Sequence, residues 1–286
     1  MKVLFISENS GGMCVLDPPG SQGIAGMCEQ LAAQLPLPLI PGRVNAMAGF
    51  YEHNGPRPNL SVSILSFHTS SLATAFEAAS SGPPPFLWNL QNSLGKASDL
   101  QGGLEAAETL LAQDMEATTA ELRARTKYVV VLLSRGVPFP RCSVNDSLLS
   151  YASPSDPSGV WADSPGAEEF CNTGGIPEDS LPGFVPGEDR NQNWQLISAV
   201  ERIVNLKDRF GVGDVRVHTA LLFDSETMAS CPICQDIAYG TAGRNIGRYT
   251  LEQLALHGQG TFIDPGLPQQ LTLDGVDTSE FPHFCP

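Results

Sequence analysis

Apolar residues in this chain form short continuous runs. Between these runs lie more polar stretches, in which apolar residues recur at the spacing of a helix. The runs at residues 2–7 (KVLFIS) and 128–133 (YVVVLL) are continuous, as in parallel strands buried on both faces. Residues 59–67 instead alternate aliphatic residues with serine, which indicates a strand with two unlike faces. Further runs occupy residues 215–223 and 261–263. We therefore predict one sheet with the first run central and 128–133 parallel beside it.

Four other stretches space their apolar residues as amphipathic helices do. They are residues 23–34, 99–114, 193–207 and 245–257. In the second, Leu104, Ala107 and Leu111 recur at helical spacing and predict one apolar face. Ser98 or Asp99 can cap its amino end.

Shorter signals fill the gaps between these elements. Residues 116–125 predict a second helical piece, and residues 69–81 a short edge strand followed by a loop. Gly258 is expected to end the last helix as its C-cap, because glycine adopts the left-handed conformation without strain.

Alternation of strands and helices predicts an α/β fold: a three-layer, doubly wound, mainly parallel sheet. A chain of this length fits a single domain over residues 1–286. Residues 138–193 form a long loop insertion, and 264–286 a C-terminal tail. In such sheets, ligands bind beyond the carboxyl ends of the strands. The glycine-rich residues 8–12, which follow the first strand, are therefore the first candidate site.

The insertion at 138–193 is strongly acidic, with nine acidic and two basic residues. Loops of this length usually carry function or are disordered. Cys142 and Cys171 flank its first half. We expect a disulfide between them, which would restrict the loop by about 3 kcal/mol.

The seven cysteines fall almost entirely in predicted loops, which favours disulfides and an oxidising compartment. The odd number leaves one thiol free or paired elsewhere. The pair Cys231 and Cys234 is a single C-x-x-C, which is weak evidence for zinc. No signal peptide and no membrane-spanning apolar stretch is visible. Either the protein is cytosolic despite its cysteines, or its natural amino terminus precedes Met1. We favour the second and expect an extracytoplasmic protein, in the periplasm or at the cell surface.

The net charge and the absence of known catalytic motifs exclude several classes of partner and enzyme. The net charge of −15 argues against nucleic acid and anionic membranes as partners, because both repel an acidic protein. The sequence contains no G-x-G-x-x-G, no P-loop motif and no G-x-S-x-G elbow. No histidine is obviously placed to activate a strand-end serine. We expect His218 to pack in the core and His68 to lie in a loop, and we predict that the protein is not an enzyme.

Residues 8–12, read as ENSGG, resemble the D-x-S-x-S motif of von Willebrand factor A (VWA) domains. In that family, the aspartate and both serines hold a divalent metal, together with a threonine and an aspartate from two further loops. Glu8, Ser10 and Gly12 stand at the first three positions here. Ser98 stands for the threonine, and Arg135 replaces the aspartate. The resemblance covers the order of elements along nearly the whole chain, whereas the metal motif is kept only in part.

The departures from the motif predict that metal binding is lost or weakened. Glu8 is one methylene longer than aspartate, Gly12 lacks the hydroxyl ligand, and Arg135 brings a positive charge. No cofactor is expected beyond weakly held Mg²⁺ or Ca²⁺, for which Glu8, Ser10 and Ser98 are the remaining ligands. In the opposing interpretation, Asp99 or another loop carboxylate compensates for the lost one. We expect Arg135 to turn inward and contact Glu8, or failing that Asp99, because its fork suits a carboxylate.

The resemblance implies a protein-binding or adhesion module of bacterial surface type, with its ligand surface at the carboxyl ends of the strands. Its partner is then another protein, which the sequence does not name. Two alternatives stay open: a metal-binding (Mg²⁺ or Ca²⁺) VWA adhesin, and an inert structural scaffold domain.

Overall fold

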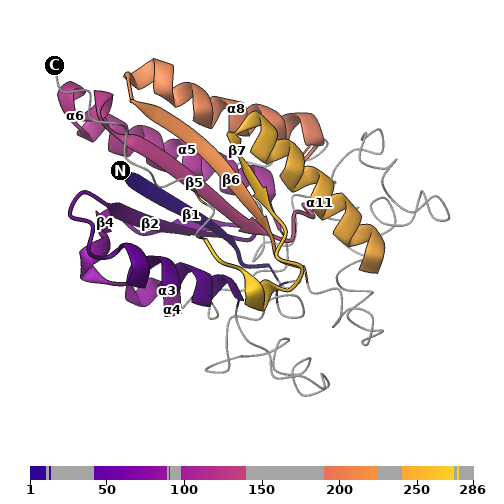
Figure 1. Cartoon of the computed structure of the whole chain (residues 1–286). Helices are drawn as coiled ribbons and strands as arrows, with labels where there is room; N and C mark the ends of the chain where they lie inside the picture. Colours follow the sequence, from indigo (N-terminus) through magenta and orange to yellow (C-terminus); the bar gives the residue numbers. More distant parts are fainter. Residues whose placement is uncertain are drawn as a thin grey trace.

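In the part of the chain that the computed structural model describes, seven strands form one mixed sheet in the order β3-β2-β1-β5-β6-β7, with β4 also paired to β2. The structure describes residues 1–10, 13, 42–88, 90, 98–139, 190–223, 240–273 and 276. The strands are β1 (Lys2–Glu8), β2 (Ser61–Phe67), β3 (Ser71–Ala73), β4 (Glu77–Ala78), β5 (Lys127–Ser134), β6 (Asp214–Leu221) and β7 (Gln259–Ile263). This mainly parallel α/β architecture confirms the predicted fold class (Figure 1).

Strand β1 lies in the interior of the sheet, as predicted. It pairs in parallel with β2 on one side and with β5 on the other, and Leu4 lies opposite Ser63 and Val130. All eight residues of β5 are buried, as its continuous apolar run indicated. Among the described strands, β3 and β4 run antiparallel to β2, and the other pairs are parallel. The predicted edge strand within residues 69–81 is thus present as two short pieces.

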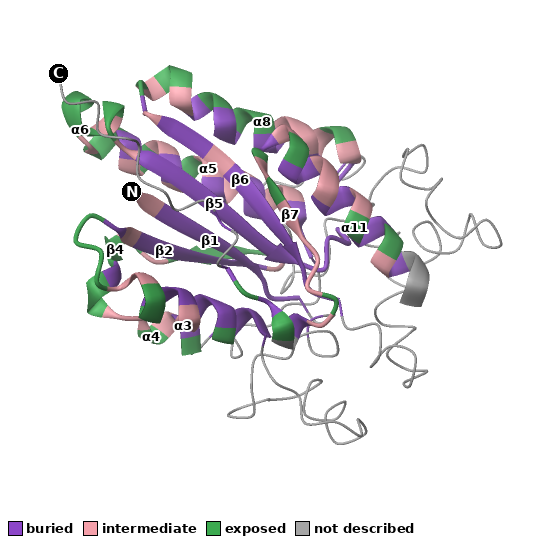
Figure 2. Cartoon of the chain, viewed as in Figure 1, coloured by how far each residue is buried: buried purple, intermediate pink, exposed green. Residues whose placement is uncertain are grey.

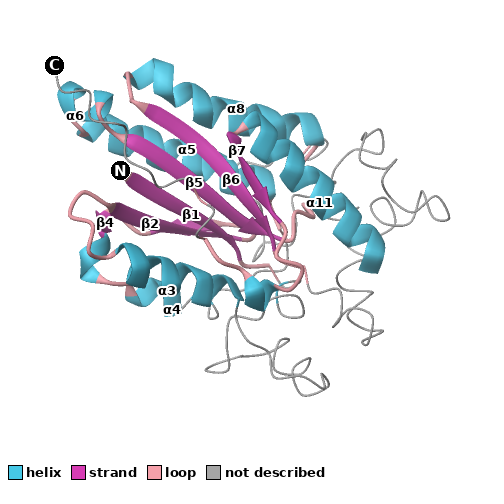
Figure 3. Ribbon diagram, in the orientation of Figure 1, coloured by secondary structure: helices cyan, strands magenta, loops and turns pink. Residues whose placement is uncertain are grey.

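Helices cover both faces of the sheet, which gives three layers (Figure 3). The helices are α3 (Gly42–Asn54), α4 (Pro85–Trp88), α5 (Leu100–Ala117), α6 (Ala120–Ala124), α8 (Asn193–Phe210) and α11 (Gly240–His257), with short 3-10 turns η1 (Ala79–Ser81) and η4 (Pro268–Gln270). Helices α5, α8 and α11 pack with Leu4 and Ile6 on one face. Helix α3 packs with Val3 and Phe5 on the other. Alternate residues of the central strands therefore face two cores. Strands β1, β2, β5 and β6 are buried almost throughout, whereas the edge strands β3, β4 and β7 carry exposed residues (Figure 2).

Several element ends differ from the predicted ones. Strand β2 begins at Ser61 and not at residue 59, β6 ends at Leu221, and α8 continues to Phe210. Helix α3 was not predicted. Gly258 is not a left-handed cap, because the positive φ of 55° falls on Gln259 instead. Glycine is required at 258 for space, since a Cβ there would lie 2.6 Å from the Cβ of Val217.

Some predictions fall outside the described residues. These are the helix at 23–34, Gly12, all seven cysteines with the expected Cys142–Cys171 disulfide, residues 140–189 of the insertion and most of the tail. Within the described part of the chain, no helix is both long and apolar enough to cross a membrane.

Candidate functional site

The carboxyl ends of β1 and β5 meet around one buried carboxylate. Glu8, the last residue of β1, has no exposed surface. The hydroxyls of Ser10 and Ser134 donate to its two oxygens at 2.5 and 2.6 Å. Arg135 donates twice, from its backbone N–H to Oε2 at 3.0 Å and from Nε to Oε1 at 3.1 Å. An ionised carboxylate has about four acceptor sites, so these four donors satisfy Glu8.

The sheet register explains why these groups meet. Ser7 pairs with Leu133 across the parallel β1–β5 ladder, so the next residues, Glu8 and Ser134, end the two strands side by side. Ser134 also accepts the backbone N–H of Gly136 at 2.8 Å, which turns the chain back over the strand end. Gly136 has a φ of 70°, and a Cβ there would lie 2.3 Å from the carbonyl oxygen of Gly247 in α11. Only glycine fits this turn.

Arg135 points inward, and its contact with Glu8 confirms the predicted one. The arginine side chain is 5% exposed and the glutamate side chain is fully buried. The Nη1 atom of Arg135 is buried and has no hydrogen-bond partner among the described residues. The contact with Glu8 therefore uses the Nε edge of the guanidinium and is not bidentate. Removing one partner of such a buried pair costs about 3–5 kcal/mol.

A second buried carboxylate, Asp99, lies immediately before α5. Arg190 binds it in a bidentate fork: its Nε donates a hydrogen bond to Oδ1 at 3.1 Å, and its Nη2 donates one to Oδ2 at 2.5 Å. Burial raises the pKa of Asp99, and the hydrogen bond and charge of Arg190 oppose that rise. A Cβ on Gly102 would lie 2.2 Å from Oδ2 of Asp99, so the absence of a side chain there admits the pair. The sequence did not predict this contact. Its only signal was that Arg190 is one of two basic residues in an acidic insertion.

The side chain of Ser98 contacts neither of these two ion pairs. Its side chain is 1% exposed, and its hydroxyl is buried without a hydrogen-bond partner among the described residues. Its backbone instead forms an antiparallel bridge with Phe139, which follows β5. The structure thus divides the predicted residues into two groups: Glu8, Ser10 and Arg135 form one, and Ser98 and Asp99 the other. Gly12 is outside the described residues.

Both buried carboxylates of the site, Glu8 and Asp99, have their negative charge balanced by an arginine. Each buried carboxylate already has a guanidinium as its counter-ion. Among the residues that the structure describes, no group of three or more His, Cys, Asp or Glu side chains is placed to hold a metal ion. His218 is 1% exposed and contacts the Thr261 hydroxyl through Nδ1 at 2.8 Å, so it packs in the core as predicted.

Comparisons with known proteins give weak similarities. No family model and no curated protein matches the chain. The PilB minor pilin from Streptococcus sanguinis matches at 15% identity with a TM-score of 0.48, and the match covers 94% of this chain and 58% of the pilin. The vWF domain of the type V pili tip protein Mfa5 from Porphyromonas gingivalis matches at 12% identity with a TM-score of 0.42, covering 92% of this chain and 88% of that domain. The hypothetical protein BatB from Bacteroides thetaiotaomicron matches at 9% identity with a TM-score of 0.38, and the match covers 92% of this chain and 89% of BatB. Scores at this level do not establish a shared function.

Proposed function

We propose that the chain is a non-enzymatic, VWA-like protein-binding module of adhesion type, acting at the cell surface or in the periplasm. Its ligand surface is the loop layer at the carboxyl ends of β1, β5 and β6. Two arginines, and not a divalent cation, hold this layer together. The observation that carries the metal-independent part of the proposal is that Ser10, Ser134 and Arg135 donate four hydrogen bonds to Glu8.

A divalent ion would have to displace those donors. Ca²⁺ takes six to eight oxygen ligands and Mg²⁺ a near-ideal octahedron. The hydroxyl protons of Ser10 and Ser134 point at Glu8, and Ser134 additionally accepts the Gly136 amide. Ion entry would also leave the guanidinium of Arg135 buried beside a cation, which like-charge repulsion opposes. The arginine therefore supplies the positive charge that a metal would bring.

Calorimetric titration with Mg²⁺ tests this proposal. The chain as it stands should show no binding heat at ion concentrations up to the millimolar range. The combined variant Glu8→Asp, Gly12→Ser, Arg135→Asp should gain binding, because it adds a hydroxyl and a carboxylate ligand, shortens the carboxylate at position 8 and removes the cation. Arg202→Asp makes the same charge change on the exposed face of α8 and serves as the control. Tight Mg²⁺ binding by the unaltered protein would refute the proposal.

Affinity capture from cell-surface extracts separates the remaining alternatives. The bead-bound domain should retain the same protein in EDTA and in Mg²⁺, since its site needs no ion. Retention that disappears in EDTA would instead support the metal-dependent adhesin. Retention that survives disruption of the strand-end layer would support the scaffold interpretation, in which other surfaces make the contacts.

A further inference from the structure

The two described residues that flank positions 140–189, Phe139 and Arg190, attach to the same place on the domain. At the leading end, Phe139 forms two backbone hydrogen bonds with Ser98: Ser98 N–H to Phe139 O at 3.0 Å, and Phe139 N–H to Ser98 O at 2.9 Å. At the trailing end, Arg190 forms the buried fork with Asp99. Positions 139 and 190 are thus bonded to two consecutive residues.

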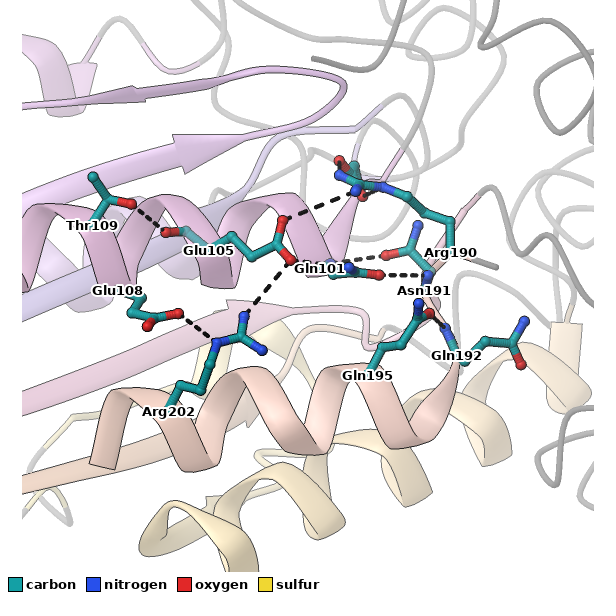
Figure 4. Close-up of polar contacts among 10 residues, drawn as sticks. Gln101, Glu105, Glu108, Thr109, Arg190, Asn191, Gln192, Gln195 and Arg202 are labelled. Carbon is teal, nitrogen blue, oxygen red and sulfur yellow. Dashed lines mark hydrogen bonds and ion pairs between the residues drawn. The ribbon is translucent and has the colours of Figure 1, made fainter. Parts of the chain in front are cut away.

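The trailing end has further attachments to α5, which Figure 4 shows. Asn191 donates its backbone N–H to Oε1 of Gln101 at 3.0 Å, and its side-chain Oδ1 accepts the backbone N–H of Gln101 at 2.8 Å. Asn191 has a φ of 57°, a left-handed conformation that asparagine tolerates better than most residues. Helix α8 begins two residues later, with a capping box formed by Gln192 and Gln195. The chain therefore passes from the attachment directly into the packed core.

The dipeptide Ser98–Asp99 is itself fixed to the domain. The backbone N–H of Asp99 donates to the carbonyl of His68, just beyond β2, at 2.9 Å. The carbonyl of Asp99 accepts the N–H of Gly103 in the first turn of α5, also at 2.9 Å. Strand β2 and helix α5 therefore hold the point to which both ends of the segment are tied.

We propose that Ser98–Asp99 is a shared anchor for Phe139 and Arg190, the residues that flank positions 140–189, and that Arg190 is the positioning residue which keeps both flanks attached. Attachment through Arg190 needs neither a metal ion nor a bond between Cys142 and Cys171. Because both ends share one dipeptide, loss of the trailing attachment loosens the leading one. The inference does not depend on what the strand-end surface binds.

Amide hydrogen exchange followed by NMR tests the coupling between the two ends. Arg190→Gln should speed exchange at Asn191 and Gln101, and also by about tenfold at Phe139, because local opening of the anchor exposes both attachments. The matched control is Arg202→Gln, which breaks exposed ion pairs to Glu105 and Glu108 between the same two helices. That control should leave the Phe139 amide unchanged. Faster exchange at Asn191 with an unaltered Phe139 amide would overturn the proposal.

Two further variants keep the inference testable if Arg190→Gln folds poorly. Arg190→Lys keeps the charge but loses the fork, and it should give a smaller acceleration at the same amides. Replacing residues 141–188 by a flexible linker of about four residues should leave the domain folded, since each extended residue spans about 3.4 Å and the ends already lie together. Cys142→Ser with Cys171→Ser should leave the Phe139 amide protected. Unfolding of the linker variant, or loss of that protection in the cysteine variant, would contradict anchoring by Ser98–Asp99.

Discussion

Two buried carboxylate–guanidinium pairs, Glu8–Arg135 and Asp99–Arg190, use the same chemistry for different purposes. Glu8 shares a single Nε contact with Arg135 and takes its other three hydrogen bonds from hydroxyls and a backbone amide. Asp99 instead receives a bidentate fork from a residue that lies beyond a long insertion. The first pair holds neighbouring strand ends together, whereas the second ties a distant chain segment to the sheet. The loss of folding stability on removing the arginine should therefore differ between the two pairs.

The largest loss of folding stability is expected from removing the carboxylate of Glu8, which accepts four hydrogen bonds. Glu8→Ala leaves Arg135 and two serine hydroxyls buried without their acceptor, so the free energy of unfolding should fall by about 3–5 kcal/mol. Urea denaturation measures this loss. Glu8→Gln keeps the size and one acceptor oxygen and should lose clearly less. A loss below about 1 kcal/mol for Glu8→Ala would mean that water replaces these contacts.

Removing the cation of the second pair should have a similar but pH-dependent effect. Arg190→Gln leaves the Asp99 carboxylate buried and unpaired, which costs about 3 kcal/mol near neutral pH. Burial already raises the pKa of Asp99, and loss of the opposing Arg190 charge raises that pKa further. The variant should therefore lose more stability as pH rises, and its deficit should shrink in acid, where Asp99 is protonated. Urea midpoints across this pH range measure the deficit, and a deficit that grows in acid would contradict this sign.

Asp99→Asn sharpens the same comparison. A folded-state pKa raised above the unfolded one gives stability that is present below the unfolded pKa and is lost as pH rises. Relative to the asparagine variant, the natural chain should thus lose stability as the pH rises above the ordinary aspartate range. At neutral pH, Asp99→Asn should cost less than Arg190→Gln, because it removes the buried charge and not its partner. Equal losses would show that the fork matters more than the charge.

Crowding of the fork gives a smaller effect that is confined to the second pair. A methyl group at Gly102 would meet Oδ2 of Asp99 at 2.2 Å and Nη2 of Arg190 at 3.0 Å. Gly102→Ala should therefore destabilise by about 1–3 kcal/mol, as overpacking does. The control is Gly49→Ala in α3, where a Cβ meets nothing within 4 Å. That change should stabilise by about 0.5–1 kcal/mol, since alanine favours helix. Thermal unfolding of both variants measures the contrast.

The two pairs also differ in how far the sequence revealed them. Valine-rich β5 and the apolar run of β1 predicted parallel neighbours, and parallel strands end at the same edge of a sheet. That geometry, together with the resemblance of residues 8–12 and Arg135 to the VWA metal-site positions, predicted that Glu8 and Arg135 would meet. Arg190 follows a long stretch without periodicity, so nothing in the pattern fixed where it returns. Side-chain pairing across such an insertion depends on tertiary packing, which local spacing does not encode.

Helix α3 shows a second limit of pattern-based prediction. Its apolar residues Val44, Met47 and Phe50 are buried, yet a glycine at each of positions 42 and 49 weakens the helical signal. The helix forms because these three residues pack against β1 and β2 in the second core. Burial therefore overrides propensity there.

The smallest effect should come from an ion pair on the same two helices that is not buried. Arg202 contacts Glu108 at 2.8 Å and Glu105 at 3.7 Å, but its side chain is 45% exposed. Exposed pairs contribute about 0–1 kcal/mol, so Arg202→Gln should reduce the free energy of unfolding by less than about 1 kcal/mol. Salt separates this pair from the Asp99–Arg190 fork, because the Debye length falls to about 3 Å at 1 M and screens exposed charges far more than buried ones. In denaturation series with added NaCl, the Arg202→Gln deficit should vanish while the Arg190→Gln deficit persists. If both deficits vanished together, the fork would be as open to solvent as the exposed pair, and its distinction from the surface network would be wrong.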